Sequence, residues 1–317
     1  MSNLTQELET VRDWLRYAVS EFTRAGLAFG HGTASAYDEA AYLILHGLHL
    51  PLDRLEPFLE ARLMPEERER LAELLGRRVG ERIPAAYLTR EAWLGEYRFY
   101  VDERVLIPRS YIAELLREDL APWIVEPARI QTALDLCTGS GCLAILLAYH
   151  FPNADVDAAD ISSEALAVAL RNVADHGLQG RVNLIRSDLL SNLTEKRYDL
   201  IVSNPPYVTT MAMEELPPEY RHEPKLALAG GDDGLDAVRT ILAQAADFLT
   251  PEGVLVVEVG QNRAAAEAAF PRLPFVWLAT ESSEESVFLL RRADLAGGAP
   301  AADGARAVAG QASSPKN

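Results

Sequence analysis

The sequence predicts an α/β protein with a mostly parallel, seven-stranded sheet, preceded by a small bundle of helices. Residues 131–292 alternate short apolar strands with helical patterns, which is typical of a parallel sheet covered on both faces. Residues 1–90 carry apolar residues at helical spacing instead. We therefore expect a helical domain, a hairpin linker, an α/β domain and a disordered tail, with the boundaries 1–90, 91–110, 111–295 and 296–317.

Composition narrows the function classes. The chain of 317 residues is 49% hydrophobic, enough for a real core, and its net charge is −17. An acidic surface disfavours tight binding to a phosphate backbone and suits a basic protein partner. The two cysteines, Cys137 and Cys142, are too few for a disulfide framework or a four-ligand zinc site, so we expect no metal. Without a signal peptide or an apolar run of roughly 18 residues, a soluble cytoplasmic protein is expected.

The first 90 residues should contain three helices. Apolar residues recur at helical spacing from residue 8 to 22, from 35 to 48 and from 65 to 80. Ser35 fits an N-cap, Pro51 ends the second helix, and Pro65 suits the first turn of the third. These helices carry no cofactor motif, so they are expected to pack or to present a surface.

The next segment changes to aromatic and β-branched residues. The run 93–101, broken by Gly95 and Glu96, predicts a hairpin, and a helical pattern returns over 111–120. Strands are then expected over 133–136, 154–160, 181–186, 200–202, 254–259, 275–280 and 286–291, and helices over 142–149 and 235–248. From residue 296 onward Gly, Ala, Ser and Pro dominate, which predicts disorder.

A glycine-rich turn with three carboxylates indicates a cofactor site. The turn from Asp135 to Gly141 joins the first strand to an apolar helix, where backbone N–H groups can approach a ligand. Asp135 precedes the turn and could receive a cationic amine; Asp160 ends the second strand, where an acid accepts from ribose hydroxyls. Asp188 follows the third strand and could accept from an adenine amine. Any one of these residues alone could be a helix cap or a turn, but together, with no basic residue in the turn, they predict a cofactor without phosphates.

A second motif, Asn204-Pro205-Pro206-Tyr207, follows the fourth strand. The prolines lack an N–H and fix the backbone, so nearby carbonyls lose their usual partner. The Asn204 side chain adds an acceptor, and Tyr207 adds a flat ring. Such a set suits a planar group with N–H donors, either an amide or the exocyclic amine of a base; alone, it is equally consistent with a proline-rich turn.

Taken together, these motifs resemble class I (Rossmann-like) S-adenosylmethionine-dependent methyltransferases that methylate amino groups. The flanking segments 105–109 and 223–235 resemble the HemK/Prm family, which methylates glutamine side-chain amides, and the resemblance covers roughly residues 5 to 292. Pro108-Arg109-Ser110 and the segment 218–224 resemble the branch that modifies large-subunit ribosomal protein L-three. Tyr111 departs from that branch, which has proline there. The release-factor branch, acting on a Gly-Gly-Gln motif, stays open as the alternative.

The resemblance implies roles for particular residues. Asn204, Pro205, Pro206 and Tyr207 would hold the glutamine amide, and Arg109 and Glu223 would order a loop or touch the protein substrate. His222 is interpreted as a solvated loop residue. The cofactor would be S-adenosylmethionine, released as S-adenosylhomocysteine, and the residues expected to bind it are Asp135, Thr138, Gly139, Ser140, Gly141, Asp160, Ile161, Asp188, Leu189 and Asn204.

Three other functions fit parts of the pattern. An adenine-N6 nucleic-acid methyltransferase would use the same four-residue motif on a flipped base, but the acidic composition disfavours it. A non-catalytic factor in ribosome assembly would bind the ribosomal protein, free or in a precursor particle, but the intact motifs disfavour a vestigial site. A nicotinamide oxidoreductase is disfavoured by Asp135 and by Ala144, which stands where the full glycine pattern has glycine.

Overall fold

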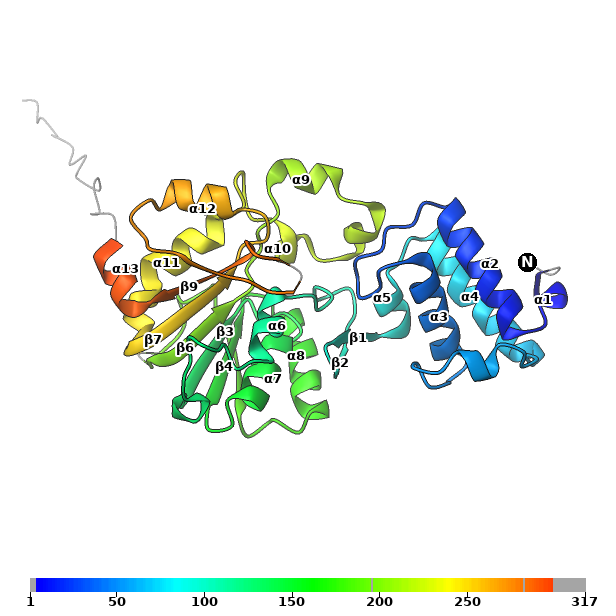
Figure 1. Ribbon diagram of the computed structural model, residues 1–317, viewed down its shortest axis with the longest axis horizontal. Helices are drawn as coiled ribbons and strands as arrows, with labels where there is room; N and C mark the ends of the chain where they lie inside the picture. The colour runs from blue at the N-terminus through cyan, green and yellow to red at the C-terminus, as the bar shows by residue number, and fades with distance from the viewer. Residues whose placement is uncertain (1–3, 195, 282, 299–317) are drawn as a thin grey trace, which may run out of the picture.

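The computed structural model describes residues 4–194, 196–281 and 283–298. A group of helices lies at one end of the molecule and an α/β domain at the other, with a two-stranded hairpin between them (Figure 1). No helix in these ranges is both long enough and apolar enough to cross a membrane.

The helical end is built on capped, amphipathic helices. Thr10 forms a capping box with Asp13, which starts the second helix at residue 11, and Ser35 caps the third through the Asp38 N–H. Apolar side chains such as Trp14 and Leu43 are fully buried between the helices. The elements are α1 (Leu4–Glu7), α2 (Val11–Arg24), α3 (Ala36–Gly47), the 3-10 turn η1 (Glu56–Phe58), α4 (Pro65–Gly80) and α5 (Ala85–Thr89).

The expected hairpin is present and leads into the α/β domain. Strands β1 (Glu91–Leu94) and β2 (Tyr97–Tyr100) pair antiparallel, with Leu94 opposite Tyr97. Helix α5 belongs to the first 90 residues, but it contacts the segment that follows the hairpin. The Tyr87 hydroxyl donates to the Val105 carbonyl at 2.5 Å. Their shared apolar cluster includes Val168 of α8 (Ser163–Asp175).

A seven-stranded, mostly parallel sheet forms the centre of the α/β domain, as predicted. Its order is β5-β4-β3-β6-β7-β9-β8, and β9 runs antiparallel to both of its neighbours. Because the central strands are buried on both faces, most of their positions are apolar, and they could be recognised as short, mainly apolar runs. The strands are β3 (Thr132–Leu136), β4 (Asp155–Asp160), β5 (Val182–Arg186), β6 (Tyr198–Ser203), β7 (Leu249–Glu258), β8 (Val276–Leu278) and β9 (Val287–Arg291).

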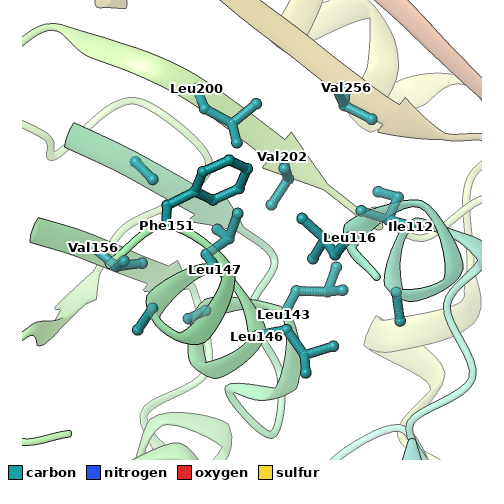
Figure 2. Close-up of a cluster of buried hydrophobic side chains, with 14 of the residues drawn as sticks. Ile112, Leu116, Leu143, Leu146, Leu147, Phe151, Val156, Leu200, Val202 and Val256 are labelled. Atoms are coloured by element: carbon teal, nitrogen blue, oxygen red, sulfur yellow. The ribbon is translucent and has the colours of Figure 1, made fainter. Parts of the chain in front are cut away.

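Helices cover both faces of the sheet. On one face, α6 (Tyr111–Leu116), α7 (Cys142–His150) and α8 pack on alternate strand residues, with Phe151 and Leu147 against Leu200 and Val202 (Figure 2). On the other face, α11 (Asp236–Phe248), α12 (Arg263–Ala269) and α13 (Arg292–Gly298) pack on the intervening residues such as Ile201. This alternation is the two-residue period of a strand.

Several boundaries differ from expectation. Strand β7, for example, begins at Leu249 instead of residue 254. The helix predicted over 111–120 ends at Leu116, because Asp119 and Leu120 take left-handed backbone angles (φ 51° and 59°). The tail predicted to be disordered from 296 begins inside α13, so 296–298 are helical, and 299–317 lie outside the described residues.

A long connection between β6 and α11 extends toward the helical end (Figure 1). It contains α9 (Thr210–Glu215), the 3-10 turn η3 (Pro218–His222) and α10 (Lys225–Leu228). Because this connection starts at the Asn-Pro-Pro-Tyr motif, it links that motif to the helical domain.

Candidate active site

A cavity of about 350 Å³ opens at the carboxyl ends of β3, β4, β5 and β6. The strand order reverses there, because the chain runs outward from β3 through β4 and β5 and then returns to β6 on the other side of β3. Open α/β sheets bind ligands at such a reversal. Seven residues predicted from the sequence line this cavity: Gly139, Asp160, Ile161, Asp188, Leu189, Asn204 and Pro206.

The glycine turn takes a backbone conformation that favours glycine. Gly139 and Gly141 both have positive φ (55° and 81°), and a Cβ on Gly141 would lie 3.1 Å from the Ala169 Cβ. Helix α7 begins directly after Gly141. The turn therefore places Gly139 at the cavity wall just before helix α7 begins.

Asp135 lies behind this turn and does not line the cavity. Its Oδ2 accepts from the Thr138 hydroxyl at 2.6 Å and from the Ala144 N–H at 3.0 Å, so it holds the turn together. Its Oδ1 is buried without a hydrogen-bond partner in the described part of the chain. Burial raises the pKa of Asp135 to about 7, because these neutral donors do not offset the loss of solvent. Thr138, Ser140 and Gly141 likewise shape the turn and are absent from the cavity lining.

Asp160 and Asp188 present carboxylates to the cavity. Asp160 accepts from the Gly139 N–H and the Ser162 N–H, both at 2.9 Å, and burial raises its pKa. The exposed Asp188 carboxylate has no partner among residues 4–194, 196–281 and 283–298. Arg104, the basic side chain among the described residues of the lining, is engaged by Asp102 through two contacts of 2.8 and 2.6 Å. The cavity therefore keeps a negative potential.

The Asn-Pro-Pro-Tyr loop forms the adjoining wall. Asn204 and Pro206 line the cavity, while Pro205 is buried and Tyr207 half-buried beside it. No described residue hydrogen-bonds to the Asn204 amide, so its donor and acceptor atoms are available to a ligand. The Tyr207 hydroxyl donates to Glu258 at 3.1 Å.

Three glycines and one amide hold this loop from behind. A Cβ on Gly260 would lie 2.6 Å from the Tyr207 ring, and one on Gly230 would lie 2.8 Å from the Pro206 carbonyl oxygen. A Cβ on Gly234 would lie 2.3 Å from the Tyr207 carbonyl oxygen, which accepts from the Asn262 side-chain amide at 2.7 Å. Glycine at positions 230 and 234 therefore allows the Asn-Pro-Pro-Tyr loop to pack directly against the backbone of this segment.

Arg109 and Glu223 pair with each other instead of lining the cavity. The two guanidinium contacts measure 2.6 and 2.7 Å, and the same carboxylate accepts from the Ile107 N–H at 3.1 Å. His31, from the helical end, lies 3.4 Å from Glu223. Burial raises the pKa of Glu223, but His31 and Arg109 outweigh burial and bring it to about 2.

Turn η3 connects this pair to the helices. Glu219 accepts from the Ala28 N–H at 3.1 Å and from Arg78 at 3.3 Å, and Arg78 also binds Glu39 at 2.6 Å. His222 Nε2 lies 2.9 Å from the Glu81 carbonyl oxygen, so it is a contact between domains.

Sequence reasoning missed Glu258, Gly260 and Asn262, which support the loop. A signal existed at Glu258: it is a charged residue at the end of an otherwise apolar strand. Its partners are distant in the sequence, so the pattern alone did not indicate what it binds. No cluster of three or more potential metal ligands occurs among the residues the structure describes.

Comparisons with known proteins identify relatives of this chain. Residues 114–216 match the family described as "Methyltransferase small domain". The chain is 59% identical to the ribosomal protein uL3 glutamine methyltransferase of Neisseria meningitidis serogroup A, over 92% of this chain and 96% of that protein. It is 58% identical to the protein of the same name from Bordetella pertussis, over 93% and 99%.

Among solved structures, the ribosomal protein L11 methylase of Lactobacillus delbrueckii subsp. bulgaricus is 20% identical, with a TM-score of 0.42 over 60% of this chain and 83% of that one. A similarity of this size says nothing about substrate. The two relatives, by contrast, match across nearly the whole length of both chains. The chain therefore belongs to the family of ribosomal protein uL3 glutamine methyltransferases.

Proposed function

We propose that this chain transfers a methyl group from S-adenosylmethionine to the side-chain amide nitrogen of a glutamine in ribosomal protein uL3, in the cytoplasm. The observation that carries the proposal is the Asn204 amide, which has no hydrogen-bond partner within the described residues and borders a cavity that also presents Asp160 and Asp188. The names of the two relatives support the choice of uL3 as substrate.

The lining fits the cofactor. A cavity of about 350 Å³ lies within the usual size of ligand sites, and its carboxylates suit hydroxyl and amine donors better than phosphates. Asp160 would accept from the ribose, Asp188 from the adenine amine, and Ile161 and Leu189 would cover the apolar edges. When bound, the cofactor supplies an activated methyl group on a cationic sulfur.

The residues of the loop then have an orienting task. An amide nitrogen is a poor nucleophile, because its lone pair is delocalised into the carbonyl, and orientation can supply roughly 7–11 kcal/mol. The Asn204 Oδ1 atom and the Pro205 carbonyl would accept from the glutamine NH₂ group. The same acceptors stabilise positive charge as it develops on nitrogen. The Tyr207 ring would lie against the plane of the amide.

Methyl transfer by an Asn204→Ala variant tests the role of this loop. Loss of one well-placed acceptor should lower the single-turnover rate on a uL3 glutamine peptide by roughly 10²–10³-fold, with little change in cofactor affinity. Asn153→Ala is the matched control, because Asn153 lies just before β4, at the opposite edge of the sheet. A rate within about threefold of wild type for Asn204→Ala would overturn the assignment.

The choice of substrate needs its own experiment. Intact uL3, a release factor and a DNA duplex would each be incubated with the enzyme and labelled cofactor, followed by mass spectrometry. We expect one methyl group on a uL3 glutamine and none on DNA. Methylation of the release factor in preference to uL3 would contradict the proposal.

The cofactor site can be tested separately. Gly139→Val should abolish cofactor binding in a folded protein, because Gly139 lines the cavity. Gly177→Val is the control: Gly177 also has a positive φ and open space around its Cβ, but it is absent from the cavity lining. Calorimetry that finds normal affinity in Gly139→Val would contradict the site.

We also propose that the helical domain, residues 1–90, recognises the protein substrate, and that Arg109 and Glu223 serve it by fixing turn η3. A chain beginning at Arg82, which keeps the α5 contact with Val105, should bind cofactor and methylate a short peptide. Its efficiency on intact uL3 should fall. Full efficiency on the intact protein would contradict this division of roles.

A further inference from the structure

Glu258 is a fully buried carboxylate that joins two loops at the active site. Its Oε2 accepts from the Ser110 hydroxyl at 2.6 Å and from the Tyr111 N–H at 2.9 Å, both at the start of α6. Its Oε1 accepts from the Tyr207 hydroxyl at 3.1 Å. Ser110 and Tyr207 are therefore linked through one side chain at the end of β7.

Ionised Glu258 destabilises the fold, because its carboxylate is buried and no cation pairs with it in the part of the chain that the structure describes. Its three donors are neutral. Burial consequently raises the pKa of Glu258 to about 7. The four residues before it in β7, Val254 to Val257, are all apolar. Local rules of this kind are broken mainly at functional sites, which points to a role in activity.

The bond from the Tyr207 hydroxyl to Glu258 complements two other contacts of this residue. Gly260 lies under the ring and Asn262 holds the backbone carbonyl. These contacts fix where the residue sits, and the bond to Glu258 fixes the far end of the ring. A ring anchored at both ends presents one orientation to a ligand.

We propose that Glu258 is a positioning residue for methyl transfer: it orients the Tyr207 ring against the substrate amide, and Ser110 holds Glu258 in place. This inference rests on the proposed function, because it assigns Tyr207 to the substrate side of the site. Glu258 itself does not line the cavity, so it would act through Tyr207.

A double-mutant cycle tests the link. Tyr207→Phe and Glu258→Gln should each lower kcat/KM for the uL3 peptide by about 10–100-fold, the range for a hydrogen bond to a charged group, and leave cofactor affinity unchanged. The double variant should be no slower than the slower single variant, because both remove one interaction. Ser110→Ala should lower the rate less. Effects that multiply in the double variant would overturn the inference.

The matched control is a second buried tyrosine–carboxylate pair in the same sheet. Tyr198 donates to Asp157 at 2.8 Å, and neither residue lines the cavity. Tyr198→Phe and Asp157→Asn should lower stability without changing kcat/KM. If this pair affects kcat/KM as strongly as Glu258 and Tyr207 do, the role of Glu258 is only structural.

A spectroscopic readout separates this inference from the proposed function. In protein labelled with ¹³C at the tyrosine ring carbon that bears the hydroxyl, the Tyr207 signal is assigned by its loss in Tyr207→Phe. It should shift in Ser110→Ala and, where that variant folds, in Glu258→Gln. Wild-type protein inactive on uL3 would overturn the proposed function, whereas an unmoved Tyr207 signal would overturn the role of Glu258.

Discussion

Carboxylates that are wholly or partly buried occur in two regions of this molecule with opposite surroundings. At the contact between the domains, Glu39, Glu219 and Glu223, here called the junction carboxylates, each contact a guanidinium. Around the cavity, the site carboxylates Asp135, Asp160 and Glu258 accept only from neutral donors among the described residues.

The pKa values follow this difference. At the junction, burial raises the pKa of Glu223, but its charged partners lower it to about 2. In the site, burial raises the pKa of Asp135 and of Glu258 to about 7. Similar burial thus gives opposite shifts, depending on whether a cation is present. The junction carboxylates are therefore matched by cations, whereas the site carboxylates are not matched within the described residues.

Removing a cation from the junction should have the largest effect. Arg78→Met leaves Glu39 and Glu219 buried without their shared partner, and should lower the free energy of unfolding by about 3–5 kcal/mol in urea titrations. Arg12→Met is the control, since its pair with Glu60 is exposed and should contribute about 1 kcal/mol or less. Equal losses in both variants would erase the distinction between the two kinds of pair.

In the site, Asp135→Asn should stabilise the fold at neutral pH, whereas Arg78→Met destabilises it at the junction. A folded pKa near 7, above the ordinary 3.8, means that ionised Asp135 weakens the fold, so wild-type stability falls as pH rises from about 4 to 7. Asparagine does not ionise, so the stability of the variant does not fall with pH for this reason. Relative to wild type, it should gain up to about 4 kcal/mol between pH 4 and pH 8 in urea titrations without ligand. A relative loss over the same interval would contradict the sign.

Glu223 should titrate in the other direction. Its folded pKa of about 2 lies below the ordinary 4.5, so its contribution is complete above pH 4.5 and is lost as pH falls toward 2. The difference corresponds to about 3 kcal/mol. Glu223→Gln should remove this part of the acid dependence, and a ¹³C titration of the wild-type carboxyl should give a pKa well below 4.5. A value at or above 4.5 would show that the junction is not charge-matched.

Asp160→Asn should give the smallest change of the four variants. The change should appear in the free energy of cofactor binding and not in the free energy of unfolding. Losing the charged acceptor for the ribose should weaken cofactor binding by roughly 10–100-fold. Because the site carboxylates lack cations, the free energy of unfolding should not decrease. Calorimetry and urea titration on the same protein measure both. Unchanged affinity with lower stability would make Asp160 a structural residue like Glu219.

Much of the fold and part of the site could be predicted from local patterns. The central strands were recognisable because they are buried on both faces and are therefore mainly apolar. The glycine turn and the Asn-Pro-Pro-Tyr motif were recognisable because their backbone requirements limit the residue types. The role expected for Asp135 differed: the structure places it behind the turn, out of the cavity lining. The position of a residue along its strand specifies at which end of the sheet it lies. It does not specify whether a loop separates the side chain from the cavity.

The sequence by itself determined which residues gather at the carboxyl edge of the sheet, because chain direction and strand order decide that. Tertiary structure alone decided which polar and charged side chains meet. Arg78 and Glu219 are separated by 141 positions, and Ser110 and Glu258 by 148. No periodic pattern joins positions so far apart, and a pKa depends on what surrounds the folded group. The contrast between a charge-matched junction and an unmatched site therefore exists only once the chain has folded.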